Sequence, residues 1–143
     1  MADPFVTEID IDAPVEEVFR HLTESSAMVD WMGQHATLDP APGGRFEIDV
    51  NGIPIRGSYL EVEAPHRVVV SWGAAGNEVL PPGSSRVEFT LTATAAGTRL
   101  RLVHADLPDE EVAKHGIGWG HFLARLAAAA SGAGAGPDAW ATG

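Results

Sequence analysis

Between residues 45 and 105 the chain runs through short stretches in which apolar and polar residues alternate, and no helical pattern interrupts them. Alternation with a period of two is typical of a strand that buries one face. Turn signals separate the stretches, and the strongest of them is the pair Asn51 and Gly52, which favours a tight hairpin. Because parallel strands need a long crossover, usually a helix, this part of the chain predicts an antiparallel meander.

Helical patterns flank this region on both sides. Pro14 opens a predicted helix with an apolar stripe that reaches Leu22, and a second short helix begins at Ser25 and is stopped by Gly33. After the meander, residues 109–131 predict one long helix with acidic residues in its first turn. The strands located by alternation are residues 5–12, 45–50, 55–63, 66–72, 86–94 and 98–105.

The length and charge of the chain limit its organisation and its partners. A chain of 143 residues fits one domain, which we place at residues 1–130, followed by a Gly/Ala-rich tail at 131–143 that we expect to be flexible. Its formal net charge of -11 repels phosphate backbones, so we expect no nucleic-acid partner. The first residues lack the features of a secretory leader and no apolar run is long enough for a membrane span, so we expect a cytoplasmic protein.

Several kinds of chemistry lack their sequence signatures. The chain has no cysteine and no spacing of His and acidic residues typical of a metal site, so we predict neither a metal nor a cofactor. No Gly-x-Ser-x-Gly motif is present, and no catalytic residue can be assigned from spacing. The glycine-rich part of the long helix reads G-x-G-x-G-H from Gly116 to His121, whereas a dinucleotide-binding fingerprint needs a later third glycine and a following strand. We therefore reject a dinucleotide site.

Three glycines inside a helix need another explanation, because each costs about 1 kcal/mol relative to alanine. On a helical wheel, Gly116 and Gly120 fall on the predicted buried face, on either side of Trp119. Their missing side chains either let the sheet approach closely or leave open volume beside the indole. Spacing alone leaves both alternatives open.

A set of short motifs appears in a recognisable order. They are I-D-A-P-V-E-E-V-F at 11–19, Trp31, G-G-R-F at 43–46, G-S-Y-L-E-V at 57–62, P-H-R-V-V-V-S-W at 65–72, and L-P-D-E-E with H-x-x-x-W at 107–119. In their order and spacing the chain resembles the START-like, Bet v 1-type superfamily of polyketide cyclase/dehydrase and lipid-transport proteins. It is most similar to the branch that contains the C-terminal domain of the Hsp90 ATPase activator.

The resemblance implies an α+β helix-grip fold. In this fold a curved antiparallel sheet of about seven strands, in the order strand, two helices, six strands and helix, wraps around a long C-terminal helix and encloses a cavity. Members of the superfamily include carriers of hydrophobic ligands, aromatase/cyclases, a co-chaperone domain and enediyne-resistance proteins. The fold therefore does not decide the function.

Strand parity and the implied cavity together give candidate ligand-binding residues. Tyr59 and Trp72 can each offer an apolar body with one polar atom, although Leu60 competes with Tyr59 for the inner face. His104 and His115 are the polar groups that we expect in the interior, where they would orient a ligand hydroxyl or carbonyl or relay a proton. Ordinary core packing is the alternative for each candidate. The candidates are Trp31, Phe46, Tyr59, Trp72, Phe89, His104, His115, Gly116, Trp119, Gly120 and Leu123.

Our first functional hypothesis is a protein that binds a small hydrophobic or aromatic molecule, polyketide-like or lipid-like, between the sheet and the long helix. The alternatives are a polyketide cyclase/aromatase-like enzyme, an interaction domain similar to the Hsp90 activator, and antibiotic self-resistance by sequestration or by self-sacrifice at a helix glycine. A protein partner, a monomer or a homodimer, and a role for His35 all stay open.

Overall fold

The computed structural model describes residues 3–141. Its elements are β1 (Phe5–Ile11), α1 (Val15–Thr23), α2 (Ser25–Met28), β2 (His35–Leu38), β3 (Arg45–Val50), β4 (Ile53–Glu63), β5 (Arg67–Trp72), β6 (Ser85–Ala93), β7 (Thr98–Ala105), α3 (Asp109–Ala130) and the 3₁₀ turn η1 (Ala139–Ala141). This order is the predicted one, so the α+β helix-grip fold is confirmed.

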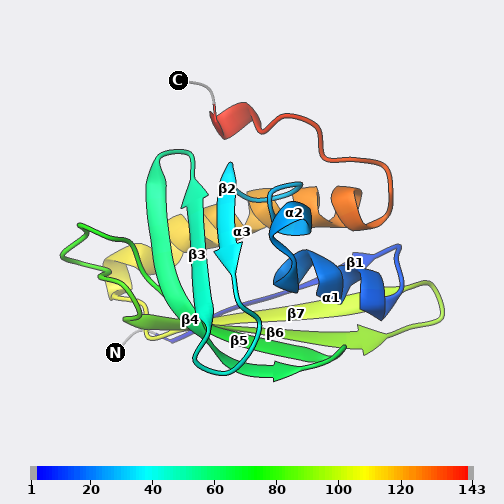
Figure 1. Ribbon diagram of the computed structural model, residues 1–143, viewed down its shortest axis with the longest axis horizontal. Coiled ribbons are helices and arrows are strands. Elements are labelled where there is room, and N and C mark those ends of the chain that lie inside the picture. The colour runs from blue at the N-terminus through cyan, green and yellow to red at the C-terminus, as the bar shows by residue number, and fades with distance from the viewer. Residues whose placement is uncertain (1–2, 142–143) are drawn as a thin grey trace.

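The strands form a single antiparallel sheet in the order β1-β7-β6-β5-β4-β3-β2. Five consecutive hairpins join β2 to β7, and β1 pairs with β7 at the far edge. Figure 1 shows β3 and β4 turned at a steep angle to β6 and β7, with α3 running across the curved sheet. The predicted meander and the predicted long helix are both confirmed.

The core lies between the inner face of the sheet and the helices. Alternate residues of β5, β6 and β7 are buried, as the period-two pattern requires. The buried inner positions of these strands are Val68, Val70, Trp72, Val87, Phe89, Leu91, Leu100, Leu102 and His104. The predicted inward face of these three strands is therefore confirmed.

A β-bulge decides which residues of β4 face the core. The register with β5 shifts between Tyr59 and Glu61. Tyr59 is completely buried, whereas Leu60 is 45% exposed. The bulge thus resolves the ambiguity of the sequence pattern in favour of Tyr59, because one extra residue changes which side chains point inward.

Two local features differ from the prediction. Strand β2 was not located from the sequence, because four residues are too few to show an alternating pattern. The second helix was predicted to extend to Gly33, but regular helix covers only Ser25–Met28 and a turn follows. Gly33 adopts a positive φ of 83°, which suits the end of this turn.

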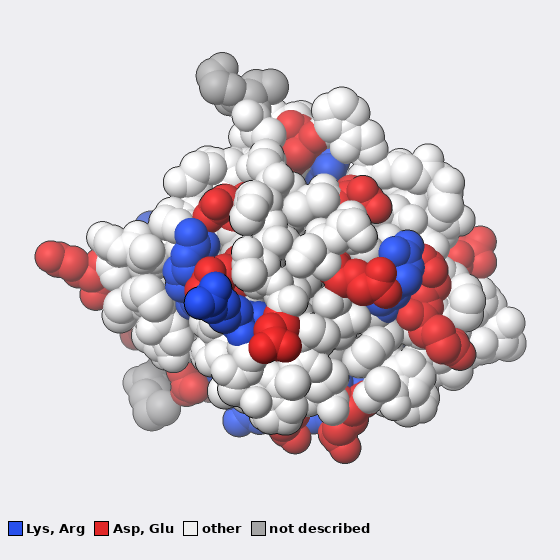
Figure 2. Space-filling model, in the orientation of Figure 1, with Lys and Arg blue, Asp and Glu red and all other residues white. Residues whose placement is uncertain are grey.

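The charged side chains of the surface are mostly paired. On the face shown in Figure 2, basic side chains lie next to acidic ones rather than gathering into a separate positive patch. Examples of such pairs are Arg56 with Asp49 and Arg99 with Asp10. Within residues 3–141, no helix has both the length and the hydropathy needed to span a bilayer.

Candidate functional site

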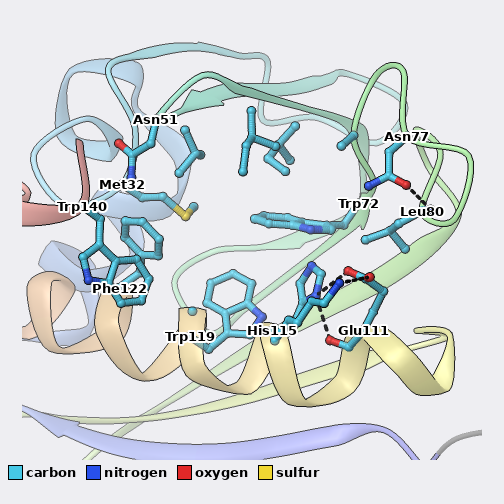
Figure 3. A pocket seen from close by; sticks show the side chains of 16 residues that line it. Met32, Asn51, Trp72, Asn77, Leu80, Glu111, His115, Trp119, Phe122 and Trp140 are labelled. Atoms are coloured by element: carbon cyan, nitrogen blue, oxygen red, sulfur yellow. Dashed lines mark hydrogen bonds and ion pairs between the residues drawn. The ribbon is translucent and has the colours of Figure 1, made fainter. Parts of the chain in front are cut away.

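A cavity of about 310 Å³ lies between α3, the β3–β4 hairpin and the loop that joins β5 to β6. Its wall on α3 is formed by Glu111, Lys114, His115, Gly118, Trp119 and Phe122. Met32, Trp72 and side chains of the hairpin and the loop form the opposite wall, as Figure 3 shows. The lining is mainly apolar, which is typical of sites that bind small organic molecules.

Two indole rings dominate the cavity. The ring centroids of Trp72 and Trp119 are 5.2 Å apart with an interplanar angle of 48°. Phe89 packs edge-on against Trp119, with ring centroids 5.9 Å apart. Flat aromatic walls of this kind favour a flat apolar ligand, because they offer large contact areas with little conformational freedom to lose.

Three of the candidate residues line this cavity: Trp72, His115 and Trp119. The others are not part of its lining. Phe46, Phe89 and Leu123 are buried in the surrounding core. Five further candidates also lie outside the cavity lining: Trp31, Tyr59, His104, Gly116 and Gly120.

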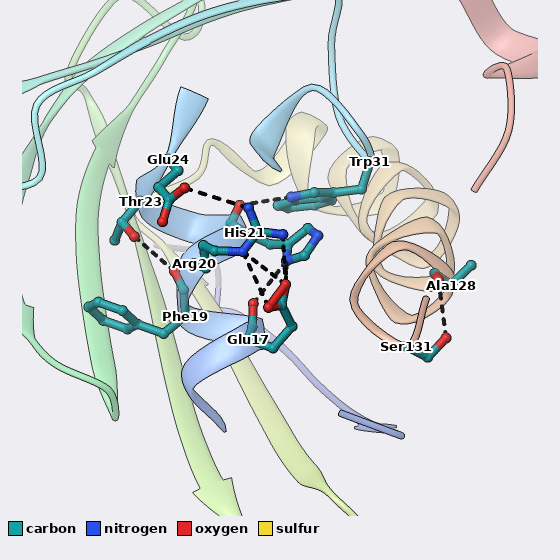
Figure 4. A network of polar contacts seen from close by, with 9 residues as sticks. All are labelled: Glu17, Phe19, Arg20, His21, Thr23, Glu24, Trp31, Ala128 and Ser131. Atoms are coloured by element: carbon teal, nitrogen blue, oxygen red, sulfur yellow. Dashed lines mark hydrogen bonds and ion pairs between the residues drawn. The ribbon is translucent and has the colours of Figure 1, made fainter. Parts of the chain in front are cut away.

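Trp31 and Tyr59 serve the end of α1. The Nε1–H of Trp31 donates to the carbonyl oxygen of His21 at 2.9 Å, and the hydroxyl of Tyr59 donates to the carbonyl oxygen of Leu22 at 2.9 Å. Burial raises the pKa of the Tyr59 phenol, so this hydroxyl stays protonated. Figure 4 shows Trp31 reaching the carbonyl end of α1 beside Glu17 and His21. These side chains satisfy carbonyl groups that the helix itself leaves unpaired.

Of the two glycines of α3 that the helical wheel placed on the buried face, only Gly116 faces the sheet. A Cβ atom on Gly116 would lie 3.0 Å from Cε1 of Phe5, so this glycine allows β1 to pack closely. Gly120 is exposed, which corrects its predicted place on the buried face. Gly118 instead lines the cavity, and a Cβ atom there would meet nothing within 4 Å. The open volume beside Trp119 therefore lies at Gly118.

His104 is an internal hydrogen-bonding link. The indole N–H of Trp119 donates to its Nδ1 at 3.0 Å, and its Nε2 lies 2.9 Å from Oγ of Ser85. Because indole can only donate, Nδ1 carries no proton and Nε2–H donates to Ser85, whose hydroxyl donates to the carbonyl oxygen of Trp72 at 2.7 Å. Burial, together with the nearby His115, lowers the pKa of His104 to about 3. The imidazole is therefore neutral at physiological pH.

His115 has a free ring nitrogen. Its Nδ1 lies 3.0 Å from the carbonyl oxygen of Glu111, and a carbonyl can only accept, so Nδ1 carries the proton. In the neutral imidazole the lone pair is then on Nε2, and no residue within 3–141 donates a hydrogen bond to it. The carboxylate of Glu111 lies 3.6 Å from Nδ1 and 3.3 Å from Nζ of Lys114.

Trp72 has a donor without an acceptor. Within residues 3–141, two buried side-chain nitrogens have no hydrogen-bond partner, Nε1 of Trp72 and Nε of Arg86. Trp72 is 5% exposed and lines the cavity, whereas Arg86 does not line it. An unsatisfied buried donor costs about 1–3 kcal/mol. The unsatisfied donor therefore belongs to a residue that lines a cavity large enough to hold an acceptor.

The C-terminal segment lies over one end of the cavity. The ring of Trp140, which lines the cavity, stacks on His121 with centroids 3.6 Å apart and an angle of 6°. Asp138 accepts hydrogen bonds from His121 at 2.7 Å and from Nδ2 of Asn51 at 3.3 Å. Burial would raise the pKa of Asp138, but the hydrogen bonds from the Trp140 N–H, His121 and Asn51 together lower it. Whether this segment is flexible stays a prediction.

Sequence reasoning missed several lining residues. Asn51, Ile53 and Leu80 belong to a hairpin and a loop, where the pattern predicts a turn but not which element the turn will cover. Gly118 was not selected, because the helical wheel placed it outside the predicted buried face of Gly116, Trp119 and Gly120. Trp140 is the one large aromatic residue of the Gly/Ala-rich tail, which predicts that it docks the tail on the surface but not that it lines the cavity. His35 lies in β2 and is not part of the cavity lining.

Metal binding has no support from the arrangement of ligands. Within residues 3–141 no three His, Asp or Glu side chains are grouped as they would be around a metal ion. Glu111 and His115 are close, but the third polar group there is the cationic Lys114.

Comparisons with known proteins identify relatives over most of the chain. The sequence model of the family described as Activator of Hsp90 ATPase homolog 1-like protein matches residues 12–131. An AHSA1-like protein from Rhizobium etli is 42% identical, with a TM-score of 0.75, and the match covers 97% of this chain and 89% of that one. No curated protein matches the chain.

Two further solved structures are relevant to the site. CalU16 from Micromonospora echinospora is 28% identical, with a TM-score of 0.73, over 87% of this chain and 72% of that one. DynU16, a protein in the dynemicin biosynthetic locus, is also 28% identical, with a TM-score of 0.76, over 89% of this chain and 46% of that one.

Proposed function

The chain belongs to the family of Activator of Hsp90 ATPase homolog 1-like proteins, and from that premise we propose that it binds a small aromatic, mainly apolar molecule in the cavity beside α3. The volume of about 310 Å³ suits a ligand of two or three fused or linked rings, at the lower end of the size range of small-molecule sites. The aromatic walls formed by Trp72 and Trp119 support a flat ligand.

The observation that carries this proposal is the open volume at Gly118. A glycine inside a helix costs about 1 kcal/mol relative to alanine, and unfilled apolar space costs more. A larger side chain at this position would fill the space without meeting any atom at its Cβ. Because a helix glycine and unfilled apolar space occur at the same place, a bound ligand explains the site better than packing does.

The experiment is a titration with the neutral fluorescent probe N-phenyl-1-naphthylamine. We expect saturable binding by the unmodified protein and a melting temperature that rises with probe concentration, because a ligand that binds only the native state stabilises it. Gly118→Leu fills the cavity and should weaken binding at least tenfold. Gly120→Leu is the matched control, since the same side chain then points to solvent two residues further along α3.

The comparison of the two variants decides the outcome. Equal binding by Gly118→Leu and Gly120→Leu would place the probe elsewhere on the surface and contradict the proposal. Absence of saturable binding by the unmodified protein would contradict it as well. Circular dichroism spectra of both variants provide the check on folding.

An enzyme acting in the same cavity is the second candidate. It is favoured by the free Nε2 of His115, which can act as a base on a bound carbonyl compound, and by the similarity to a protein of a biosynthetic locus. This candidate predicts turnover of a poly-β-keto substrate that is lost in His115→Phe. The interaction-domain and self-resistance alternatives stay predictions.

A further inference from the structure

The cavity contains two polar atoms whose hydrogen-bonding capacity the protein does not use, and they are of opposite kinds. One is the donor Nε1–H of Trp72, and the other is the acceptor Nε2 of His115. Both residues line the cavity, and Figure 3 shows the imidazole of His115 rising from α3 toward the ring of Trp72. A ligand of the proposed function that fills this end of the cavity therefore lies beside both side chains.

The side chain of His104 fixes the relative positions of the two residues. Its ring lies 5.8 Å from that of Trp72 and 5.0 Å from that of His115, measured between centroids, and it meets both edge-on. The two nitrogens of His104 are already occupied by Trp119 and Ser85. His104 therefore positions the free donor and the free acceptor without competing for a ligand.

Most of the other polar groups that line the cavity are engaged within the protein. The carbonyl oxygen of the Asn77 side chain accepts from the backbone N–H groups of residues 79 and 80. Asn51 donates to Asp138, and Glu111 is paired with Lys114. Lys114 itself is 72% exposed at the rim, so no cation faces the interior that would receive an anionic ligand.

We propose that the ligand carries a hydroxyl group on its aromatic ring system, of the phenol or naphthol type. The hydroxyl hydrogen donates to Nε2 of His115, and the hydroxyl oxygen accepts from Nε1–H of Trp72. A hydroxyl is the smallest neutral group that both donates and accepts, so it satisfies both free atoms at once. A carboxylate would leave Nε2 of His115 without a donor, and an ammonium group would leave Nε1–H of Trp72 without an acceptor. This inference rests on the proposed function.

The test uses three ligands with the same ring system: 1-naphthol, 1-methoxynaphthalene and naphthalene. Naphthol offers a donor and an acceptor, the methyl ether only an acceptor, and the hydrocarbon neither. We expect naphthol to bind the unmodified protein about tenfold more tightly than either of the others, because it alone satisfies both the free donor and the free acceptor. Dissociation constants follow from calorimetry or from quenching of tryptophan fluorescence.

Two variants assign the preference to the two atoms. Trp72→Phe keeps a flat ring and removes the donor, and His115→Phe keeps a ring and removes the acceptor. Each should reduce the ratio of the naphthalene and naphthol dissociation constants to about twofold or less. His66→Phe is the matched control, because His66 is exposed and lies outside the cavity, and it should keep the tenfold ratio.

The outcomes separate this inference from the proposed function. If the unmodified protein binds N-phenyl-1-naphthylamine in a manner that depends on Gly118 but shows no preference for naphthol, the inference is wrong and the proposed function stands. A preference that survives both Trp72→Phe and His115→Phe would also overturn the inference. If neither the probe nor any naphthalene binds, the proposed function fails. The ligand comparison needs no variant, so it decides the question even if one variant does not fold.

Discussion

The two histidines beside Trp72 differ in which ring nitrogen carries the proton, and this difference separates a structural role from a binding role. His104 uses both nitrogens to connect Trp119 with Ser85, and Ser85 in turn holds the backbone of Trp72. His115 uses one nitrogen on the carbonyl oxygen of Glu111 and leaves the other free. One residue therefore holds the aromatic wall in place, and the other has a ring nitrogen that the proposed ligand can contact.

The low pKa of His104 predicts how stability depends on pH. Its ordinary pKa is 6.5 and the folded value is about 3, so between these values the unfolded chain binds a proton that the native protein does not. The free energy of unfolding should therefore fall as the pH drops below about 6.5, by up to about 1.4 kcal/mol per pH unit, until about pH 3. Above about pH 6.5, His104 is mainly neutral in both the folded and the unfolded chain, so it no longer lowers the free energy of unfolding.

His104→Gln tests this prediction, because glutamine keeps a donor and an acceptor but does not titrate. Urea unfolding at pH 7.5 and pH 5.0 should show that the variant starts less stable but loses up to about 2 kcal/mol less than the unmodified protein over this range. The carboxylates titrate in both proteins and cancel in the comparison. An equal loss in both proteins would show that His104 does not cause the pH dependence.

At the scale of the element, the three glycines of α3 have three different surroundings. Gly116 faces β1 and contacts Phe5, Gly118 faces the cavity, and Gly120 faces solvent. Successive residues of a helix are rotated by about 100°, so glycines two apart point in very different directions. The single helix thus combines a packing contact, an open ligand wall and an exposed position.

Alanine substitutions should separate these surroundings. Gly120→Ala and Gly118→Ala should each raise the free energy of unfolding by up to about 1 kcal/mol, because alanine favours the helix and neither new methyl meets a neighbour. Gly116→Ala should gain less or destabilise, since the methyl would lie 3.0 Å from the Phe5 ring. Urea unfolding measures all three, and an equal gain at the three positions would contradict the assignment of Gly116 to close packing.

At the scale of the whole molecule, segments that are far apart in the sequence enclose the cavity. The hairpin at residues 51–52, the loop after β5 and the C-terminal segment meet above α3. Asp138 connects two of them, because it accepts from His121 on α3 and from Asn51 in the hairpin. Arg125 donates to the carbonyl oxygens of Ala135 and Gly136 and so holds the start of the C-terminal segment.

Removing Trp140 should open the cavity without unfolding the protein. Its side chain is 48% exposed, so Trp140→Ala should change the free energy of unfolding by less than about 1 kcal/mol. The dissociation rate of N-phenyl-1-naphthylamine should rise severalfold, because one wall of the cavity is lost. Stopped-flow fluorescence measures this rate. Ile117→Ala, which removes an exposed apolar side chain of α3 outside the cavity, is the control and should leave the rate unchanged.

Local sequence patterns suffice to predict the antiparallel meander, the long C-terminal helix and the inward faces of β5, β6 and β7. These features depend on periodicity and turn residues, which are local properties of the chain. They also place Trp72, His115 and Trp119 among the candidate residues, and these three line the cavity. Together with the resemblance to the START-like superfamily, they predict the helix-grip fold.

Contacts that form on folding, and not local sequence patterns, determine which polar side-chain atoms lack a hydrogen-bond partner and which glycine faces the cavity. Hydrogen bonds between distant residues occupy His104 and leave Nε2 of His115 available, and no local pattern records such pairings. The cavity is lined by Gly118 and not by the predicted Gly116 and Gly120. Glycine has no side chain whose hydropathy would show which of the three faces the cavity. The position of Trp140 likewise depends on contacts with α3 and the β3–β4 hairpin, which form only when the chain is folded.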